Sequence, residues 1–282
     1  MKLKNKIIAL LKGCISSLLL SLNFFAFSII IIIIMSLTYL IPRHSWRYAL
    51  KSRVDSITSC FFLSCTLIIK VLHLSTFNIT STSPLKKHSW YLIIANHATW
   101  LDILSAGIFF KFKIPSLKFF MKKELLWSLP LGGLACYLAD FPFLERTTKS
   151  KIKKNPKLKN KDIKTTQALC RKLVNYPTAL IIFPEGTRFN PQKQKKQQSP
   201  FHYLLKPKAA GIATVIQEMG SKLDGIIDLT LSYSSPSFSI WDFLCGKVKT
   251  ITIHYDIIPI TDDWKGDYQK DRAYRVAIQQ KM

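Results

Sequence analysis

One uninterrupted apolar run near the amino terminus constrains this chain most. No charged residue occurs between Lys12 and Arg43, and the run includes six consecutive isoleucines from Ile29 to Ile34. At a rise of about 1.5 Å per residue, a helix over residues 16–41 is long enough to cross a bilayer with some tilt. The run is too long for the apolar part of a cleaved signal sequence. We therefore expect a retained membrane-anchoring helix, rather than a signal peptide or a buried core helix.

A second apolar stretch covers residues 57–77 and is interrupted by Lys70 and His73. Polar residues within an apolar run favour an interfacial helix over a second clean span. Together with the first helix, this stretch predicts an N-terminal membrane-anchoring segment over residues 1–80. Basic residues flank the first helix on both sides, so the positive-inside rule does not orient it.

The charge balance limits the partners that the chain can have. Its 282 residues carry 41 Lys and Arg against 16 Asp and Glu, a net charge of +25, and 48% of them are hydrophobic. A basic and apolar chain suits an anionic membrane surface, so membrane lipids are expected partners. Only eight of the basic residues are Arg, and neither a zinc-finger spacing nor an RNA-binding aromatic motif accompanies them. No nucleic-acid partner is expected.

The six cysteines show no Cys-x-x-Cys pair and no regular spacing. Several lie within apolar runs, as packed and reduced cysteines facing a cytosolic compartment do. No metal site is expected, because no second cysteine or histidine lies at a ligand spacing. The cysteines are Cys14, Cys60, Cys65, Cys136, Cys170 and Cys245.

After a polar, proline-containing junction at residues 81–87, short β-rich runs alternate with helical patterns. Strands are predicted at residues 90–95, 117–121, 179–183, 226–233 and 248–255, and helices at 101–110, 125–138 and 162–173. Two basic stretches, residues 149–161 and 191–196, are predicted to be solvated loops. The alternation predicts one α/β domain over residues 85–282, in which helices cover a mixed sheet.

A histidine and an aspartate directly follow the first of these strands. Asp102 comes five positions after His97, so an aspartate at the start of a helix can reach back to the imidazole. A carboxylate bonded to Nδ1–H would fix the tautomer and leave Nε2 free to accept a proton from an attacking hydroxyl. The nucleophile would be the acceptor's own hydroxyl, so no catalytic serine is needed. The pattern alone is weak, because a single histidine is usually structural.

A second motif, Phe-Pro-Glu-Gly-Thr-Arg, covers residues 183–188 and again follows an apolar strand. Gly186 permits a tight turn and a close approach of the backbone to a ligand. Arg188 presents a planar fork that suits phosphate. The alternative is a surface turn whose Glu185 and Arg188 pair in water.

The two motifs together resemble those of the lysophospholipid acyltransferase superfamily, typified by the 1-acylglycerol-3-phosphate acyltransferases. Residues 122–125 with 130–133 are similar to the family's second motif. Residues 143–146 are similar to the segment that supplies a further basic contact to the acceptor phosphate. Residues 140–143, residues 161–162 with 165–166, and residues 199–200 with 204–213 are similar to the bacterial YihG-like subgroup and, more distantly, to lysocardiolipin acyltransferase-like enzymes.

The resemblance implies a glycerol-phosphate acyltransferase-like fold and a single displacement. His97 would remove the proton from the hydroxyl of a lysophospholipid, and Asp102 would stabilise the imidazolium. The hydroxyl would attack the thioester of acyl-CoA or acyl carrier protein, and neither a bound cofactor nor a metal is required. The subgroup implies a bacterial inner membrane, with the active site on its cytoplasmic side.

The resemblance also assigns the acceptor site. Arg188 and Arg146 would hold the phosphate of a lysophosphatidate-like acceptor. The other residues expected to shape that site are Glu185, Gly186, Thr187 and Lys123. Two alternatives stay open at this point: acyl transfer to a membrane acceptor that is not a phospholipid, and a non-catalytic adaptor that binds anionic lipid.

Overall fold

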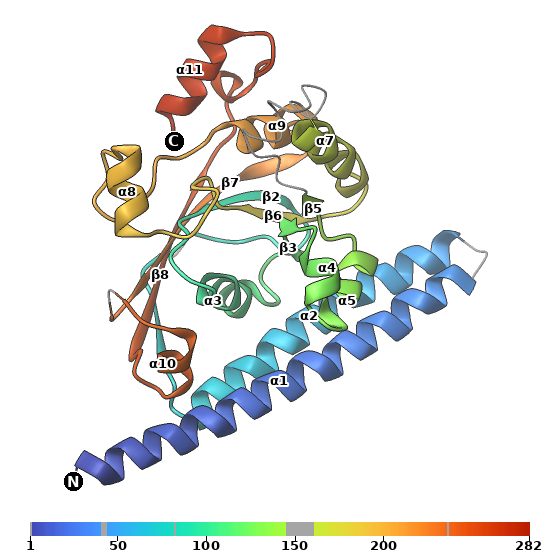
Figure 1. Cartoon of the computed structure of the whole chain (residues 1–282). Helices are drawn as coiled ribbons and strands as arrows, with labels where there is room; N and C mark the ends of the chain where they lie inside the picture. Colours follow the sequence, from blue (N-terminus) through green and yellow to red (C-terminus); the bar gives the residue numbers. More distant parts are fainter. Residues whose placement is uncertain (1, 41–43, 82, 145–160, 236) are drawn as a thin grey trace.

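Two long helices run along one side of an α/β body in the computed structural model (Figure 1). They are α1 (Lys2–Leu40) and α2 (His44–Val71), and they lie side by side. The structure describes residues 2–40, 44–81, 83–144, 161–235 and 237–282. α1 begins at Lys2, well before residue 16, which is the predicted start of the membrane helix.

The main sheet has six strands in the order β1–β8–β7–β2–β6–β3. Their bounds are β1 Thr76–Ile79, β2 Trp90–Ala95, β3 Leu117–Phe119, β6 Ala179–Ile182, β7 Leu223–Tyr233 and β8 Thr250–Ile258. β7 and β8 are antiparallel, and all other neighbours in this sheet are parallel. β4 (Met121–Lys122) and β5 (Phe143–Leu144) form a separate two-stranded parallel sheet. The predicted mixed sheet is therefore confirmed, and each of the five predicted strands overlaps one of its strands.

Helices cover both faces of the main sheet because alternate residues of its central strands point to opposite sides. In β2, Ile93 packs in one core with residues of α3 (Leu101–Phe110). Leu92 packs in a second core with residues of α7 (Lys161–Leu173) and α9 (Ala210–Met219). Both strand residues are fully buried. Figure 1 shows α3 on the side of the sheet that faces α1 and α2, and α7 and α9 on the other side.

The prediction of a second apolar helix over residues 57–77 is wrong at the carboxyl end of that helix. α2 stops at Val71, and Thr76–Ile79 form the strand β1, which pairs in parallel with β8. The hydroxyl of Ser75 donates to the carbonyl of Val248 just before this pairing begins. A short apolar segment fits a strand as well as a helix, and here pairing with a distant strand decides between them.

The predicted helix at residues 125–138 is broken into α4 (Leu125–Ser128) and α5 (Gly132–Leu138). Pro130 lies at the break, and it has no N–H to donate to the preceding turn. Leu131 has a φ of 57°, which lies outside the right-handed helical region. The chain therefore turns here instead of continuing α4.

The prediction of a loop at residues 191–196 is wrong, because these residues belong to α8 (Pro191–Gln197). The side chain of Asn190 caps this helix by accepting hydrogen bonds from the N–H groups of Gln192 at 2.9 Å and Lys193 at 3.3 Å. Pro191 occupies the first turn, where its missing N–H costs nothing. The other predicted basic loop, residues 149–161, lies outside the described residues except for Lys161, which begins α7.

Three further helical elements come after β7: α10 (Ile240–Leu244) lies between β7 and β8, and the 3-10 helix η2 (Asp262–Trp264) and α11 (Arg272–Gln280) follow β8. α10 packs on α1, where the hydroxyl of Ser16 donates to the carbonyl of Leu244 at 2.8 Å. α5 also packs on α1, so closely that a Cβ at Gly132 would overlap the ring of Phe24. Contacts at two places thus hold α1 against the α/β body.

Two segments, Leu3–Thr38 of α1 and Arg53–Val71 of α2, are long and apolar enough to cross a membrane by length and composition. Only 11% and 22% of the residues in their most apolar windows are buried, so most of this apolar surface is open. The division into a membrane-anchoring segment over residues 1–80 and an enzyme domain over residues 85–282 stays a prediction.

Candidate active site

His97 and Asp102 form a hydrogen-bonded pair at the carboxyl end of β2. His97 follows β2 in the chain, and Asp102 lies in the first turn of α3. The Nδ1 atom of His97 lies 2.8 Å from Oδ2 of Asp102. The aspartate side chain is completely buried, whereas 18% of the histidine side chain is exposed. Part of the imidazole is therefore accessible while its partner is shielded from water.

Asp102 is surrounded by hydrogen-bond donors. Its Oδ2 atom also accepts hydrogen bonds from the backbone N–H groups of Ala98 at 2.8 Å and Thr99 at 2.9 Å. Its Oδ1 atom accepts a hydrogen bond from the phenol of Tyr233 at 2.5 Å. An ionised carboxylate acts only as an acceptor, so Nδ1 of His97 carries the proton and Nε2 is left as the acceptor in the neutral ring.

Tyr233 is a site residue that the sequence analysis missed. It lies at the end of β7, which is the neighbour of β2 in the sheet. Burial, and then the charge of Asp102, raise the pKa of Tyr233 well above its usual range. The phenol therefore stays protonated and can donate to Asp102. The sequence identifies Tyr233 as a site residue only once the strand order is known, because that order places the end of β7 beside β2.

The second motif meets the first through an aromatic contact. Phe183 follows β6, which pairs with β2 in parallel, so both motifs lie at the same edge of the sheet. The rings of His97 and Phe183 are stacked, with centroids 4.2 Å apart and planes inclined by 24°. This stacking restricts the rotation of the imidazole and fixes the direction in which Nε2 points.

Glu185 is buried between two backbone segments. Its Oε1 atom accepts a hydrogen bond from the N–H of His97 at 2.7 Å, and its Oε2 atom accepts one from the N–H of Leu205 at 2.8 Å. Burial raises the pKa of Glu185, and the hydrogen bonds from His97 and Leu205 oppose that shift. Only 3% of the residue is exposed. Glu185 thus ties the loop that begins with Asn96 and His97, which we call the catalytic loop of the candidate site, to the chain after α8.

The rest of the second motif lies near the loop that carries the His97–Asp102 dyad. Gly186 has a φ of 70°, a conformation that favours glycine. Thr187 accepts a hydrogen bond through Oγ1 from the ammonium of Lys193 at 2.9 Å. The guanidinium of Arg188 is exposed and lies 4.5 Å from the ring centre of Trp100, at the start of α3. The N–H of Phe189 donates to the carbonyl of His97 at 2.7 Å, which joins the two motifs directly.

Two predicted site residues are not placed beside the dyad. Arg146 lies outside the described residues. Lys123 is exposed just after β4, and its N–H donates to the carbonyl of Leu144 at 2.9 Å. In the described parts of the chain, no group of three or more His, Cys, Asp or Glu side chains could hold a metal ion.

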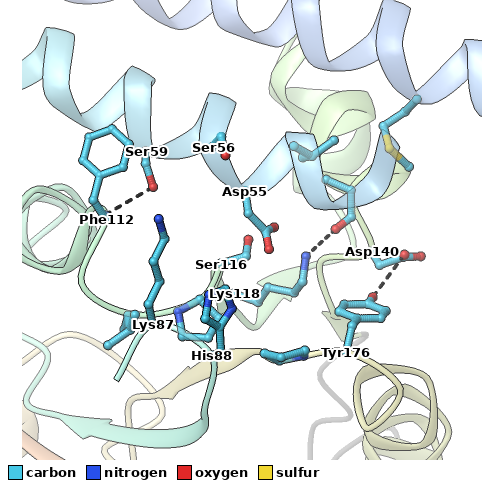
Figure 2. Close-up of a pocket in the computed structure, with 16 residues that line it drawn as sticks. Asp55, Ser56, Ser59, Lys87, His88, Phe112, Ser116, Lys118, Asp140 and Tyr176 are labelled. Carbon is cyan, nitrogen blue, oxygen red and sulfur yellow. Dashed lines mark hydrogen bonds between the residues drawn. The ribbon is translucent and has the colours of Figure 1, made fainter. Parts of the chain in front are cut away.

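A cavity of about 420 Å³ lies at the opposite edge of the sheet, beneath α2 (Figure 2). Its walls include Ser116 and Pro177, which precede β3 and β6, so it lies at the amino ends of the strands, whereas His97 follows a carboxyl end. The ammonium of Lys118 donates to the carbonyl of Ala139 at 2.7 Å within it. This cavity is therefore distinct from the dyad.

A family model described as Acyltransferase matches residues 76–234 of the chain. The 1-acyl-sn-glycerol-3-phosphate acyltransferase epsilon of Mus musculus is 25% identical over 256 residues, which cover 78% of this chain and 66% of that protein. The 2-acyl-1-lysophosphatidylinositol acyltransferase of Saccharomyces cerevisiae is 24% identical over 229 residues, which cover 64% of this chain and 57% of that protein. The chain thus spans less than two thirds of the length of these curated relatives.

The crystal structure of the 1-acyl-sn-glycerophosphate (LPA) acyltransferase PlsC from Thermotoga maritima is similar to the whole chain. The TM-score is 0.52 at 16% identity, and the match covers 95% of this chain and 97% of that chain. At this identity the likeness concerns the fold. The family match, in contrast, spans more than half of the sequence and includes both motifs of the site, so the chain belongs to the Acyltransferase family.

Proposed function

We propose that this protein transfers a fatty acyl group from a soluble thioester, acyl-CoA or acyl carrier protein, to the free hydroxyl of a lysophospholipid. The observation that carries the proposal is the His97–Asp102 pair, in which the imidazole is partly exposed and its Nδ1 is bonded to a buried carboxylate. Membership of the Acyltransferase family supports the reaction type. The names of the mouse and yeast relatives support a lysophospholipid as the acceptor.

The geometry supports a single displacement. Nε2 of His97 accepts the proton of the acceptor hydroxyl as that oxygen attacks the thioester carbonyl carbon. Asp102 stabilises the imidazolium, since it is bonded to the opposite ring nitrogen. When the tetrahedral intermediate collapses, the carbon–sulfur bond breaks and the imidazolium gives its proton to the departing thiolate. The products are the acylated lipid and a free thiol.

The acceptor phosphate is assigned to the side of the dyad where Arg188 lies. Its guanidinium is exposed and stacked on Trp100, so it is held in place and still able to bind a phosphate in two-point fashion. By the family resemblance alone, Arg146 is proposed as a second contact to the phosphate and Lys123 as a further contact to the acceptor. Glu185 contributes indirectly, through the backbone of His97.

Membrane attachment is assigned to α1 and α2, because both substrate and product are lipids and both helices leave apolar surface open. We further propose membership of the bacterial YihG-like subgroup and a location at the inner membrane with the site facing the cytoplasm. These two statements rest on the sequence segments at residues 140–143, 161–162 with 165–166, and 199–200 with 204–213.

A product scan tests the proposed function. Purified protein is given labelled acyl-CoA and a panel of lysophospholipids, and the products are identified by mass spectrometry, with the His97→Ala protein as the blank. A diacyl product that forms only with intact His97 is expected. Acylation of a lipid without phosphate would favour the alternative acceptor, and binding of anionic vesicles without any turnover would favour the adaptor.

A further inference from the structure

Five exposed lysines lie on α8 and in the chain just after it, in the segment that follows the second motif. We call them together the α8 basic surface, and they are Lys193, Lys195, Lys196, Lys206 and Lys208. No aspartate or glutamate occurs between Gly186 and Gln217, so no acidic residue of this segment neutralises these charges. Two exposed aromatic side chains lie in the same segment: Phe201 is 39% exposed and Tyr203 is 80% exposed.

This surface is joined to the catalytic loop. The ammonium of Lys193 donates to Thr187 Oγ1 at 2.9 Å, and the ammonium of Lys208 lies beside Gly186. The chain between α8 and Lys208 is held through the N–H of Leu205, which donates to Glu185. An anion bound to Lys193 or Lys208 would therefore lie next to Thr187 and Gly186 of the second motif.

The position of the surface argues against the bilayer as its partner. Figure 1 shows α8 well separated from α1 and α2, with α3 and the sheet between them. The large apolar residues that α1 exposes, such as Leu18 and Ile33, are on the helix pair. If a bilayer covers only this pair, it does not reach α8. The α8 basic surface therefore faces the water, from which a soluble donor arrives.

We propose that the α8 basic surface binds the 3′-phosphorylated ADP portion of acyl-CoA while the thioester reaches His97. This inference rests on the proposed function, of which it names the donor. The nucleotide carries three phosphate groups, and lysine ammonium groups bind phosphates as point charges. Tyr203 and Phe201 offer exposed rings on which an adenine can stack. The pantetheine arm of CoA separates thioester and nucleotide, so a nucleotide site beside the dyad, rather than in it, is what acyl-CoA requires.

The test uses lysines that make no contact with the catalytic motif. The triple variant Lys195→Gln, Lys196→Gln, Lys206→Gln removes three positive charges and leaves Lys193 and Lys208 in place. The control variant Lys164→Gln, Lys172→Gln, Lys222→Gln removes three exposed charges elsewhere. We expect the triple variant to raise the KM for acyl-CoA by roughly tenfold, because each exposed ion pair contributes little by itself.

Two comparisons make this result specific. The KM for an acyl-pantetheine thioester, which has no nucleotide, should stay within about twofold of the unmodified protein's value in the triple variant. The control variant should change neither the KM for acyl-CoA nor the KM for acyl-pantetheine. An equal rise for acyl-pantetheine, or a rise only for the lysophospholipid, would overturn the inference. A loss confined to acyl carrier protein as donor would instead identify an acidic protein as the partner. Weaker binding to phosphatidylglycerol vesicles would point to lipid headgroups.

A measurement without turnover separates this inference from the proposed function. Calorimetry with 3′,5′-ADP should show binding to the intact protein and to the control variant, and loss of that binding in the triple variant. Unchanged 3′,5′-ADP binding in the triple variant, or none in the intact protein, would overturn the inference even if acyl transfer were found. Failure of acyl transfer with 3′,5′-ADP binding as expected would count against the proposed function alone.

Discussion

The phenol of Tyr233, at the end of β7, donates a hydrogen bond to Oδ1 of Asp102 at 2.5 Å. The carboxylate that it holds is the one that orients His97. We expect Tyr233→Phe to lower kcat by about tenfold to a hundredfold, because a hydrogen bond to a buried charged acceptor is worth about 1.5–3 kcal/mol. The KM values for both substrates should change little, since Tyr233 acts through Asp102. Steady-state kinetics with each substrate varied in turn will measure this.

Tyr274→Phe is the matched control, since its phenol also donates a buried hydrogen bond, to the carbonyl of Trp264 at 2.7 Å. It is expected to reduce the free energy of unfolding without a comparable loss of kcat. If the two variants lost the same fraction of kcat for the same loss of stability, the role of Tyr233 would be structural only.

The raised pKa of Tyr233 also predicts a pH dependence of stability. Burial and the charge of Asp102 favour the neutral phenol in the folded state. The unfolded phenol ionises near pH 10, so this contribution is fully present below that pH and declines as the pH rises above it. Denaturant unfolding at about pH 8 and about pH 10.5 should show a smaller alkaline decline for Tyr233→Phe than for the unmodified protein. An identical decline would contradict the assignment.

His97→Ala should abolish most of the acyl transfer, with a loss of about a hundredfold to ten-thousandfold, while membrane association is unchanged. Asp102→Asn should also reduce kcat, because an amide can hold the ring in the wrong tautomer. The two losses should not add in the double variant, since both residues act as one unit. His254, which pairs with Asp256 at 3.1 Å on β8, provides a matched control. Additive losses, or a similar loss in His254→Ala, would contradict the dyad.

The local part of this site is readable from the sequence, and the long-range part is not. His97 and Asp102 are five positions apart across a strand end and a helix start, so their contact follows from local structure. Tyr233 is 131 positions from Asp102, and its contact requires that β7 be the neighbour of β2. The strand β1 depends in the same way on pairing with β8. The break at Pro130 could be predicted because proline has no N–H to donate within a helix. The helical pattern on both sides of it nevertheless favoured one continuous helix over residues 125–138.

Glu185 is predicted to act as a brace. Each of its carboxylate oxygens accepts one backbone N–H, from His97 and from Leu205. In Glu185→Gln an amide nitrogen would face one of these donors, so we expect a loss of about 1–3 kcal/mol in the free energy of unfolding. A fall in kcat should accompany it because the backbone of His97 shifts. Chemical denaturation and kinetics measure both effects, and Glu218→Gln, remote from the dyad, serves as the control. Full stability in Glu185→Gln would contradict the brace.

The last prediction concerns Arg188 and separates a phospholipid acceptor from the alternatives. If its guanidinium binds the acceptor phosphate, Arg188→Ala should raise the KM for the lysophospholipid by about tenfold to a hundredfold, the range of one charge-assisted hydrogen bond. The KM for the acyl thioester should change far less. Arg188→Lys should restore only part of the affinity, because an ammonium keeps the charge but lacks the planar fork.

Trp100 gives this prediction a second arm, because its ring lies 4.5 Å from the guanidinium and holds it over the start of α3. Trp100→Leu should raise the KM for the lysophospholipid in the same direction but less strongly, since the arginine stays present and only its orientation is lost. In the double variant with Arg188→Ala, the change at Trp100 should have almost no further effect on that KM. A defect of Arg188→Ala confined to the acyl donor would move the lipid phosphate to another part of the site, and unchanged KM values for both substrates would favour an acceptor without phosphate.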